Sequence, residues 1–197
     1  TGKITLNDAS LAYDYSGTAA QLVEAFAGIT GLKGDIIVAT GVPSIADLKA
    51  LNKSIDGTIK VTADTDLEGS AKDLIEALKD VTLTAASTVE VTGAVTVAQI
   101  LALQGTTATV TFANTSAALT GTTVDILDAL DSAPAGYKGA IKVTDTISAA
   151  NLKIINDATT GKITLSKVSE PLSDNYATLK DALNDITGYK GAIELTG

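Results

Sequence analysis

The chain has 197 residues, a formal net charge of −9, and no cysteine, histidine, methionine or tryptophan. An acidic surface repels phosphate backbones and anionic lipids, which argues against nucleic-acid partners. The missing side chains are those most used for disulfides, thiolate metal sites and general-base catalysis. No apolar run approaches the roughly 20 residues of a membrane span, so membrane insertion is not expected.

Eight short strand cores recur along the chain, most of them an apolar, polar, apolar triplet. Their first residues are separated by steps of 32, 23, 30, 21, 31, 22 and 30 positions, so long and short steps alternate. A fixed period in this range predicts a repeat architecture. The cores are residues 4–6, 36–38, 59–61, 89–91, 110–112, 141–143, 163–165 and 193–195.

Between the cores the apolar spacing changes from two to three and four, which is typical of an amphipathic helix. Leu74 and Leu78 illustrate this spacing in one segment, and Ile126 and Leu130 in another. Each strand is therefore followed by one helix, and we call such a strand-helix unit a coil. Gly-Tyr-Lys-Gly at 136–139 and 188–191 places a glycine where a helix ends and an aromatic ring that can fold back on it.

The polar residue at the centre of most cores decides between two α/β architectures. A sheet covered by helices on both faces needs strands that are apolar throughout, whereas a central Lys60, Glu90 or Lys142 requires one face in water. The expected fold is a one-sided parallel β/α solenoid, similar in construction to leucine-rich repeats. Its coils alternate between long (about 31 residues) and short (about 22), with all eight cores in one sheet. The repeat at 81–94 is degenerate, because 81–84 competes as a strand.

The long coils carry extra residues between strand and helix, at 7–17, 62–69, 113–121 and 166–175. Insertions that recur every second coil should align along one edge, where repeat proteins often bind partners. These four insertions are therefore the candidate surface for a glycan or a protein. Only the first carries aromatic residues, Tyr13 and Tyr15, which favours a spacer over a binding face.

One metal site can be considered. Asp64, Asp66 and Glu68 provide alternating oxygen ligands of the kind that calcium prefers. The alternative is a solvated loop whose polar side chains cap the next helix. The sequence has no nucleophile elbow and no glycine-rich phosphate loop, so neither catalysis nor an organic cofactor is expected.

The segments at 141–152 and 161–191 resemble α/β-solenoid repeats of very large bacterial surface and secreted proteins. These include RTX-type adhesins and giant cyanobacterial surface proteins. The resemblance implies an extracellular or cell-surface location and a structural role. The glycine-aspartate nonapeptide that binds calcium in RTX proteins is not found in this chain.

The leading hypothesis is that residues 1–197 form one continuous repeat array, a segment of a longer chain or filament. It would act as a rigid, non-enzymatic spacer in a surface protein, fibre, sheath or adhesin. Its expected partners are flanking repeats or other copies, joined head-to-tail through strands 4–6 and 193–195. The alternative is a binding module that uses the four insertions.

Overall fold

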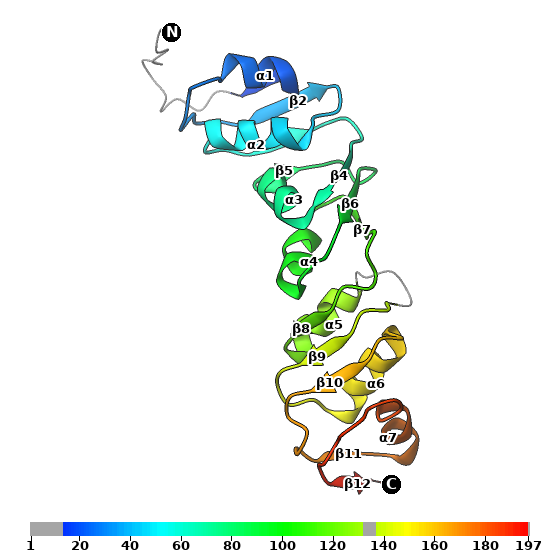
Figure 1. Cartoon of the computed structure of the whole chain (residues 1–197). Helices are drawn as coiled ribbons and strands as arrows, with labels where there is room; N and C mark the ends of the chain where they lie inside the picture. Colours follow the sequence, from blue (N-terminus) through cyan, green and yellow to red (C-terminus); the bar gives the residue numbers. More distant parts are fainter. Residues whose placement is uncertain (1–13, 132–136, 197) are drawn as a thin grey trace. The chain divides into compact units, whose positions relative to one another are not determined.

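The computed structural model describes residues 14–131 and 137–196. These form a mixed α/β structure with seven helices and short parallel strands (Figure 1). The chain divides into two compact units, one of residues 1–92 and 105–111 and the other of residues 93–104 and 112–197.

The helices are short and most follow a strand directly or within a few residues. They are α1 (Ala19–Ala25), α2 (Ile45–Ser54), α3 (Ala71–Leu78), α4 (Val97–Gln104), α5 (Thr123–Asp131), α6 (Ala149–Ala158) and α7 (Tyr176–Ala182). The strands are β1 (Tyr15–Thr18), β2 (Ile36–Thr40), β3 (Ile59–Val61), β4 (Asp66–Ser70), β5 (Val81–Thr82), β6 (Thr88–Thr92), β7 (Thr109–Phe112), β8 (Leu119–Gly121), β9 (Ile141–Val143), β10 (Ile163–Leu165), β11 (Leu172–Asp174) and β12 (Ile193–Leu195).

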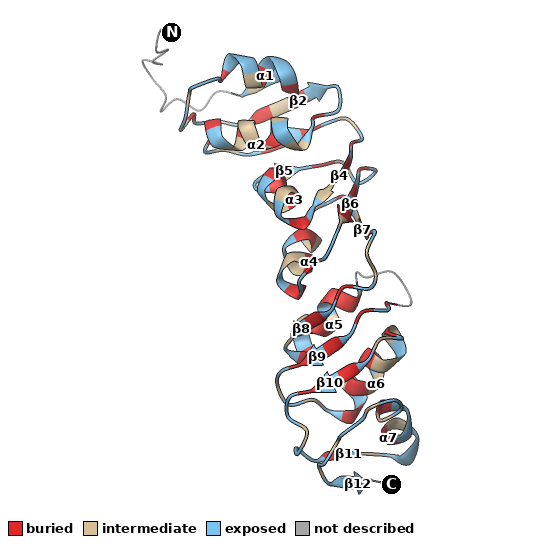
Figure 2. Ribbon diagram, viewed as in Figure 1, coloured by how far each residue is buried: buried red, intermediate tan, exposed pale blue. Residues whose placement is uncertain are grey.

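Seven of the eight expected strand cores coincide with strands, and the eighth, 4–6, lies outside the described residues. One-sided burial is seen in the cores of β3, β6, β9 and β10 (Figure 2). In β3, β9 and β10 the two outer residues are buried and the central residue is exposed. In β12 all three residues are exposed.

The expectation of one sheet containing all the cores in order is wrong. The described strands form four sheets, β1-β2-β3-β5, β4-β6-β7, β8-β9-β10 and β11-β12. Cores separated by a short step share a sheet, as β9 and β10 do, whereas cores separated by a long step, such as β10 and β12, do not. The pairs with defined registers are parallel and join positions 21 to 23 apart in the sequence. A long step of 30 to 32 positions is longer than the 21 to 23 positions between paired residues. Another strand must therefore pair with the core that follows a long step.

That strand comes from the insertions, which were expected to be loops. β1, β4, β8 and β11 lie at the C-terminal ends of the insertions, and each pairs with the core that follows the next helix. Leu67, Leu119 and Leu172 supply their apolar anchors and are 4%, 0% and 2% exposed. At the degenerate repeat both candidate strands form: β5 pairs with β3, and β6 pairs with β4.

A side chain caps the start of every described helix. At each one the hydroxyl or amide oxygen of the capping residue accepts the backbone N–H three residues later, at 3.0–3.3 Å. These caps satisfy backbone donors that have no partner inside the helix. The caps are Thr18, Ser44, Ser70, Thr96, Thr122, Ser148 and Asn175. Successive caps are separated by steps of 26 positions, with a single step of 27 at the end.

Glycines allow neighbouring backbones to approach closely just before the strands of the β8-β9-β10 sheet. A Cβ on Gly139 would lie 1.9 Å from the carbonyl oxygen of Ala117, and one on Gly161 would lie 2.0 Å from that of Gly139. No side chain fits at these distances, so glycine at these positions sets the spacing between consecutive coils.

Replacing Gly139 by alanine should lower the free energy of unfolding by at least ~1–3 kcal/mol, because the backbone of the preceding coil must move. Denaturant titration followed by circular dichroism measures this loss. Gly105→Ala is the matched control, since no atom lies within 4 Å of its Cβ position. Its change should stay within about 0.5 kcal/mol. Equal losses in the two variants would contradict the close approach of the coils.

Candidate functional site

The acidic triplet considered for calcium lies in and just before β4. Asp64 accepts a hydrogen bond from the Thr84 hydroxyl at 2.7 Å, and Asp66 accepts one from the Thr88 hydroxyl at 2.6 Å. Glu68 lies exposed on the strand. In the described part of the chain, no group of three or more His, Cys, Asp or Glu side chains is placed to hold a metal ion. The structure thus uses Asp64 and Asp66 to join one coil to the next.

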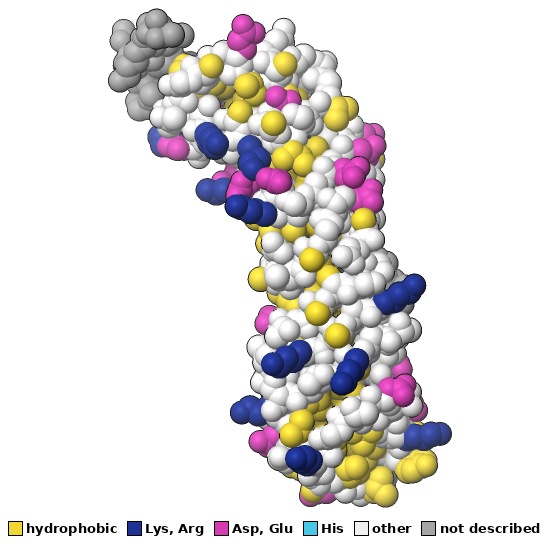
Figure 3. Space-filling view, viewed as in Figure 1, with side chains coloured by type: hydrophobic (Ala, Val, Ile, Leu, Met, Phe, Trp, Pro, Cys, Tyr) yellow, Lys and Arg dark blue, Asp and Glu magenta, His cyan; other side chains and the backbone are white. Residues whose placement is uncertain are grey.

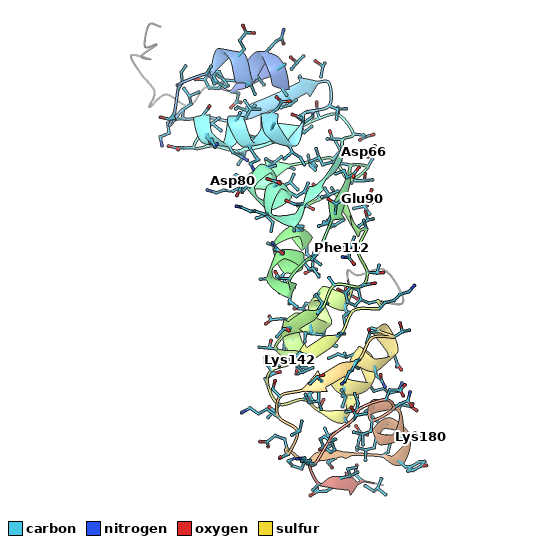
Figure 4. All side chains as sticks on the ribbon, in the orientation of Figure 1. Asp66, Asp80, Glu90, Phe112, Lys142 and Lys180 are labelled. Atoms are coloured by element: carbon cyan, nitrogen blue, oxygen red, sulfur yellow. The ribbon has the colours of Figure 1, made fainter. Side chains whose placement is uncertain are left out.

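The outward face of the β4-β6 pair is acidic. Asp66, Glu68 and Glu90 are exposed, and Glu68 lies directly opposite Glu90 in the parallel register. Figure 4 shows Asp66 and Glu90 on the side of these strands that faces away from α3. Like charges at opposed positions repel, so this face favours hydration over packing against another sheet.

Two tyrosines join their coil to the preceding insertion. The hydroxyl of Tyr137 donates to the carbonyl oxygen of Ala117, and that of Tyr189 donates to the carbonyl oxygen of Glu170. Tyr137 is only 1% exposed, and burial raises the pKa of its hydroxyl. The repeated Gly-Tyr-Lys-Gly segment predicted a ring folded back on the helix end. It did not predict these bonds, whose acceptors belong to the coil before.

Side chains of the even-numbered helices bind the end of the helix that follows. The amides of Asn52, Gln104 and Asn156 donate to backbone carbonyls near the C-terminal ends of α3, α5 and α7 at 2.6–3.3 Å. Their sequence numbers differ by 52, which is two cap-to-cap steps, so the three side chains occupy one repeat position. Helix C-termini carry carbonyls without intrahelical partners, and these amides satisfy some of them.

Two lysines add charge to the same helix pairs. Lys49 of α2 contacts Asp73 and Glu76 of α3, at 2.8 and 2.7 Å. The hydrogen bonds that the Lys49 ammonium donates to Asp73 and Glu76 raise the pKa of Lys49 and lower the pKa of both carboxyls. Lys153 of α6 contacts Asp157 of its own helix at 2.6 Å and Asp181 of α7 at 3.5 Å. These pairs orient the helices, although exposed ion pairs stabilise a fold only weakly.

Two other helix pairs, α1-α2 and α5-α6, have apolar grooves between them. A groove of about 700 Å³ lies between α1 and α2, lined by Val23, Phe26 and Ala50 among others. A second, of about 430 Å³, is lined by Leu127, Leu130 and Ile154 between α5 and α6. Each of these residues of the second groove corresponds to one of the first after four cap-to-cap steps. Hydrophobic side chains reach the surface over α1 and α2 in Figure 3. The bordering charges differ: Lys49, Lys53 and Asp73 flank the first groove, whereas Asp128 and Asp131 flank the second.

Of the two aromatic residues named in the first insertion, the structure describes Tyr15 alone. Tyr13 lies outside the described residues. Tyr15 lies on β1 and meets Phe26, the C-cap of α1, edge to face, with ring centroids 5.0 Å apart. An edge-to-face pair of this kind packs a helix onto its own strand.

No family model, curated protein or solved structure matches the chain. Within the described residues, no helix has the length and apolar character needed to cross a bilayer.

Replacing Tyr137 by phenylalanine should lower the free energy of unfolding by about 1 kcal/mol, since the buried Ala117 carbonyl loses its partner. Tyr176→Phe is the control, because Tyr176 is 70% exposed. Its effect should be within about 0.5 kcal/mol. A loss at Tyr176 as large as that at Tyr137 would contradict the assigned bond.

The raised pKa of Tyr137 also predicts a pH dependence. The folded state holds the phenolic proton more tightly than the unfolded state, whose tyrosines titrate near pH ~10. The stabilisation is therefore complete below about pH 10 and is lost as the pH rises toward the folded pKa. Unfolding free energies measured from pH 8 to 11 should fall less steeply for Tyr137→Phe than for the unaltered chain. Identical slopes would show that burial does not shift this group.

Proposed function

We propose that the chain is a non-enzymatic structural module of an extracellular surface protein, fibre, sheath or adhesin. In this proposal the coils form a one-sided parallel β/α solenoid that acts as a rigid spacer or filament segment. The observation that carries it is the recurrence of the same inter-coil bonds at the same repeat positions. Side chains that recur in this way along one chain serve the stacking of coils.

Bonds on both sides of the coils support rigidity. On the helix side, Asn52 and Asn156 join successive helices. On the strand side, parallel pairing and the Tyr137 hydroxyl join successive strands. A coil that is bonded to its neighbour on both the helix side and the strand side resists bending at the interface between the two coils.

The insertions fit a spacer better than a binding face. Three insertions form strands at their C-terminal ends: β4 at the end of 62–69, β8 at the end of 113–121 and β11 at the end of 166–175. Part of each of these insertions is therefore already paired with another strand. The outward face of β4 and β6 offers exposed carboxylates and no aromatic platform. Sugar recognition generally uses aromatic faces beside polar groups.

A distance measurement by pulsed electron paramagnetic resonance tests rigidity. The chain has no cysteine, so Val42→Cys and Ile154→Cys place two spin labels without other changes. Both positions are exposed, at 63% and 55%. A rigid spacer predicts one narrow distance distribution.

A broad distribution would reject the spacer. The binding alternative is measured separately by screening the unaltered chain against a panel of immobilised glycans. Specific binding that is lost on changing Glu68 and Glu90 to glutamine, with the narrow distribution retained, would favour a binding module.

A further inference from the structure

The two apolar grooves on the helix side occupy equivalent repeat positions but differ in shape. The first lies between α1 and α2 and the second between α5 and α6, each within one of the two compact units. Ala50 lines the first groove, and Ile154 lines the second, four cap-to-cap steps later. Because an isoleucine side chain is larger than that of alanine, the first groove is open at about 700 Å³ and the second is reduced to about 430 Å³.

The second helix pair presents a ridge where the first presents smaller side chains. Ile154 of α6 is 55% exposed and Val124 of α5 is 64% exposed. Val124 lies one helical turn before Leu127, so the two share a face of α5, and Leu127 lines the second groove together with Ile154. We call Val124, Leu127 and Ile154 the ridge. The equivalent residues of the first pair are all smaller: Ala20, Val23 and Ala50. Large side chains on one helix surface fit the depressions that small ones leave on another.

The charges beside the two surfaces are opposite. Lys49 at the first groove is held by two carboxylates of α3, whereas Lys53 is exposed and makes no ion pair with another described residue. Asp128 and Asp131 at the second groove are exposed, and within residues 14–131 and 137–196 their carboxylates have no ion-pair partner. A chain of net charge −9 generally repels its own copies, so a basic residue beside an apolar groove marks a place where another copy is attracted.

We propose that the ridge of one copy of this chain binds the first groove of a second copy. In this contact Ile154 packs against Phe26 and Ala50. The ammonium of Lys53 faces the carboxylates of Asp128 and Asp131. Apolar contacts at the centre with polar and oppositely charged groups at the rim are typical of specific protein interfaces. This inference rests on the proposed structural function and names a partner for it, a second copy that binds through the helix side.

Charge and shape exclude contacts between identical surfaces. Two first grooves face to face would bring one Lys53 against the other and would leave two depressions with nothing to fill them. Two ridges face to face would bring Asp128 and Asp131 of one copy against the same carboxylates of the other. Like charges at an interface cost binding free energy. The contact therefore joins two different surfaces, and because each copy carries both, it continues from one copy to the next.

Sedimentation velocity at rising protein concentration tests the charges. The unaltered chain should form species larger than a monomer. Lys53→Glu makes the first groove acidic and Asp128→Lys makes the side of the ridge basic, so each should raise the concentration needed for association roughly tenfold. The matched controls are Lys60→Glu and Glu90→Lys, which change the net charge by the same amounts at exposed strand positions. Both controls should associate as the unaltered chain does.

Mixing the groove variant with the ridge variant tests whether two different surfaces meet. The Lys53→Glu chain keeps its ridge unaltered, and the Asp128→Lys chain keeps its groove unaltered. At a concentration where neither variant associates alone, an equal mixture should therefore form a complex of both chains. The proposal would be overturned by a mixture that stays monomeric, by controls that weaken association as much as the variants, or by an unaltered chain that is monomeric at all concentrations.

Filling the first groove tests the shape without changing the charge. Ala50→Ile supplies the residue that the second groove already holds at this position, so the chain should keep its circular dichroism spectrum and lose its association. Ala102→Ile is the matched control, because Ala102 holds the same repeat position on α4 and lines neither groove. Association that survives Ala50→Ile, or that Ala102→Ile abolishes as well, would contradict the proposal. A narrow spin-label distribution would leave the spacer intact in that case, so the two proposals fail separately.

Discussion

The structure depends on two repeat lengths that the chain must satisfy together. The helix caps recur in steps of 26 positions, and paired strands are separated by 21 to 23 positions. Two neighbouring helices occupy about 16–20 Å, because packed helices lie about 8–10 Å apart. Three strands at about 4.8 Å occupy only about 14 Å. The strand layer is therefore narrower than the helix layer, which accounts for separate sheets, with a new sheet beginning at every second coil.

The two-coil repeat also separates two kinds of helix contact. From an even to an odd helix, Asn52 and Asn156 bind backbone carbonyls of the next helix. From an odd to an even helix, Phe26 and Leu130 occupy the corresponding repeat position and border apolar grooves. Amide bonds fix distance and direction, whereas apolar contacts tolerate change in both. Alternating the two contacts fixes the pairing of coils at every second interface.

Much of this arrangement was readable from the sequence. The apolar-polar-apolar cores predicted strands with one face in water, because alternation is a local property. The regular spacing of Ser or Thr three residues before an Asp or Gln, as at Ser44 and Ser70, is also present in the sequence, but the alternation of long and short strand steps is the more conspicuous pattern.

The rest depends on residues distant in sequence. Leu67 and Leu119 are single apolar residues in polar insertions, and only pairing with the next core makes their segments strands. Asp64 and Asp66 resembled calcium ligands, and their threonine partners come from the following coil. The acceptor of the Tyr137 hydroxyl also lies in another coil. Local sequence patterns specify the helices and strands. The residues that interact between coils are determined instead by the register in which the strands pair.

The claim that two coils form the repeating unit is tested most directly by deletion. Removing 45–96 takes out two full cap-to-cap steps and joins Ser44 to Val97, so that Ser44 replaces Thr96 as the cap of α4. The account predicts that this shorter chain keeps its helical circular dichroism and unfolds cooperatively. Removing 45–83 takes out one and a half cap-to-cap steps and should abolish the cooperative transition. Equally cooperative unfolding of both deletion variants, or loss of folding in the first alone, would contradict a structural unit of two coils.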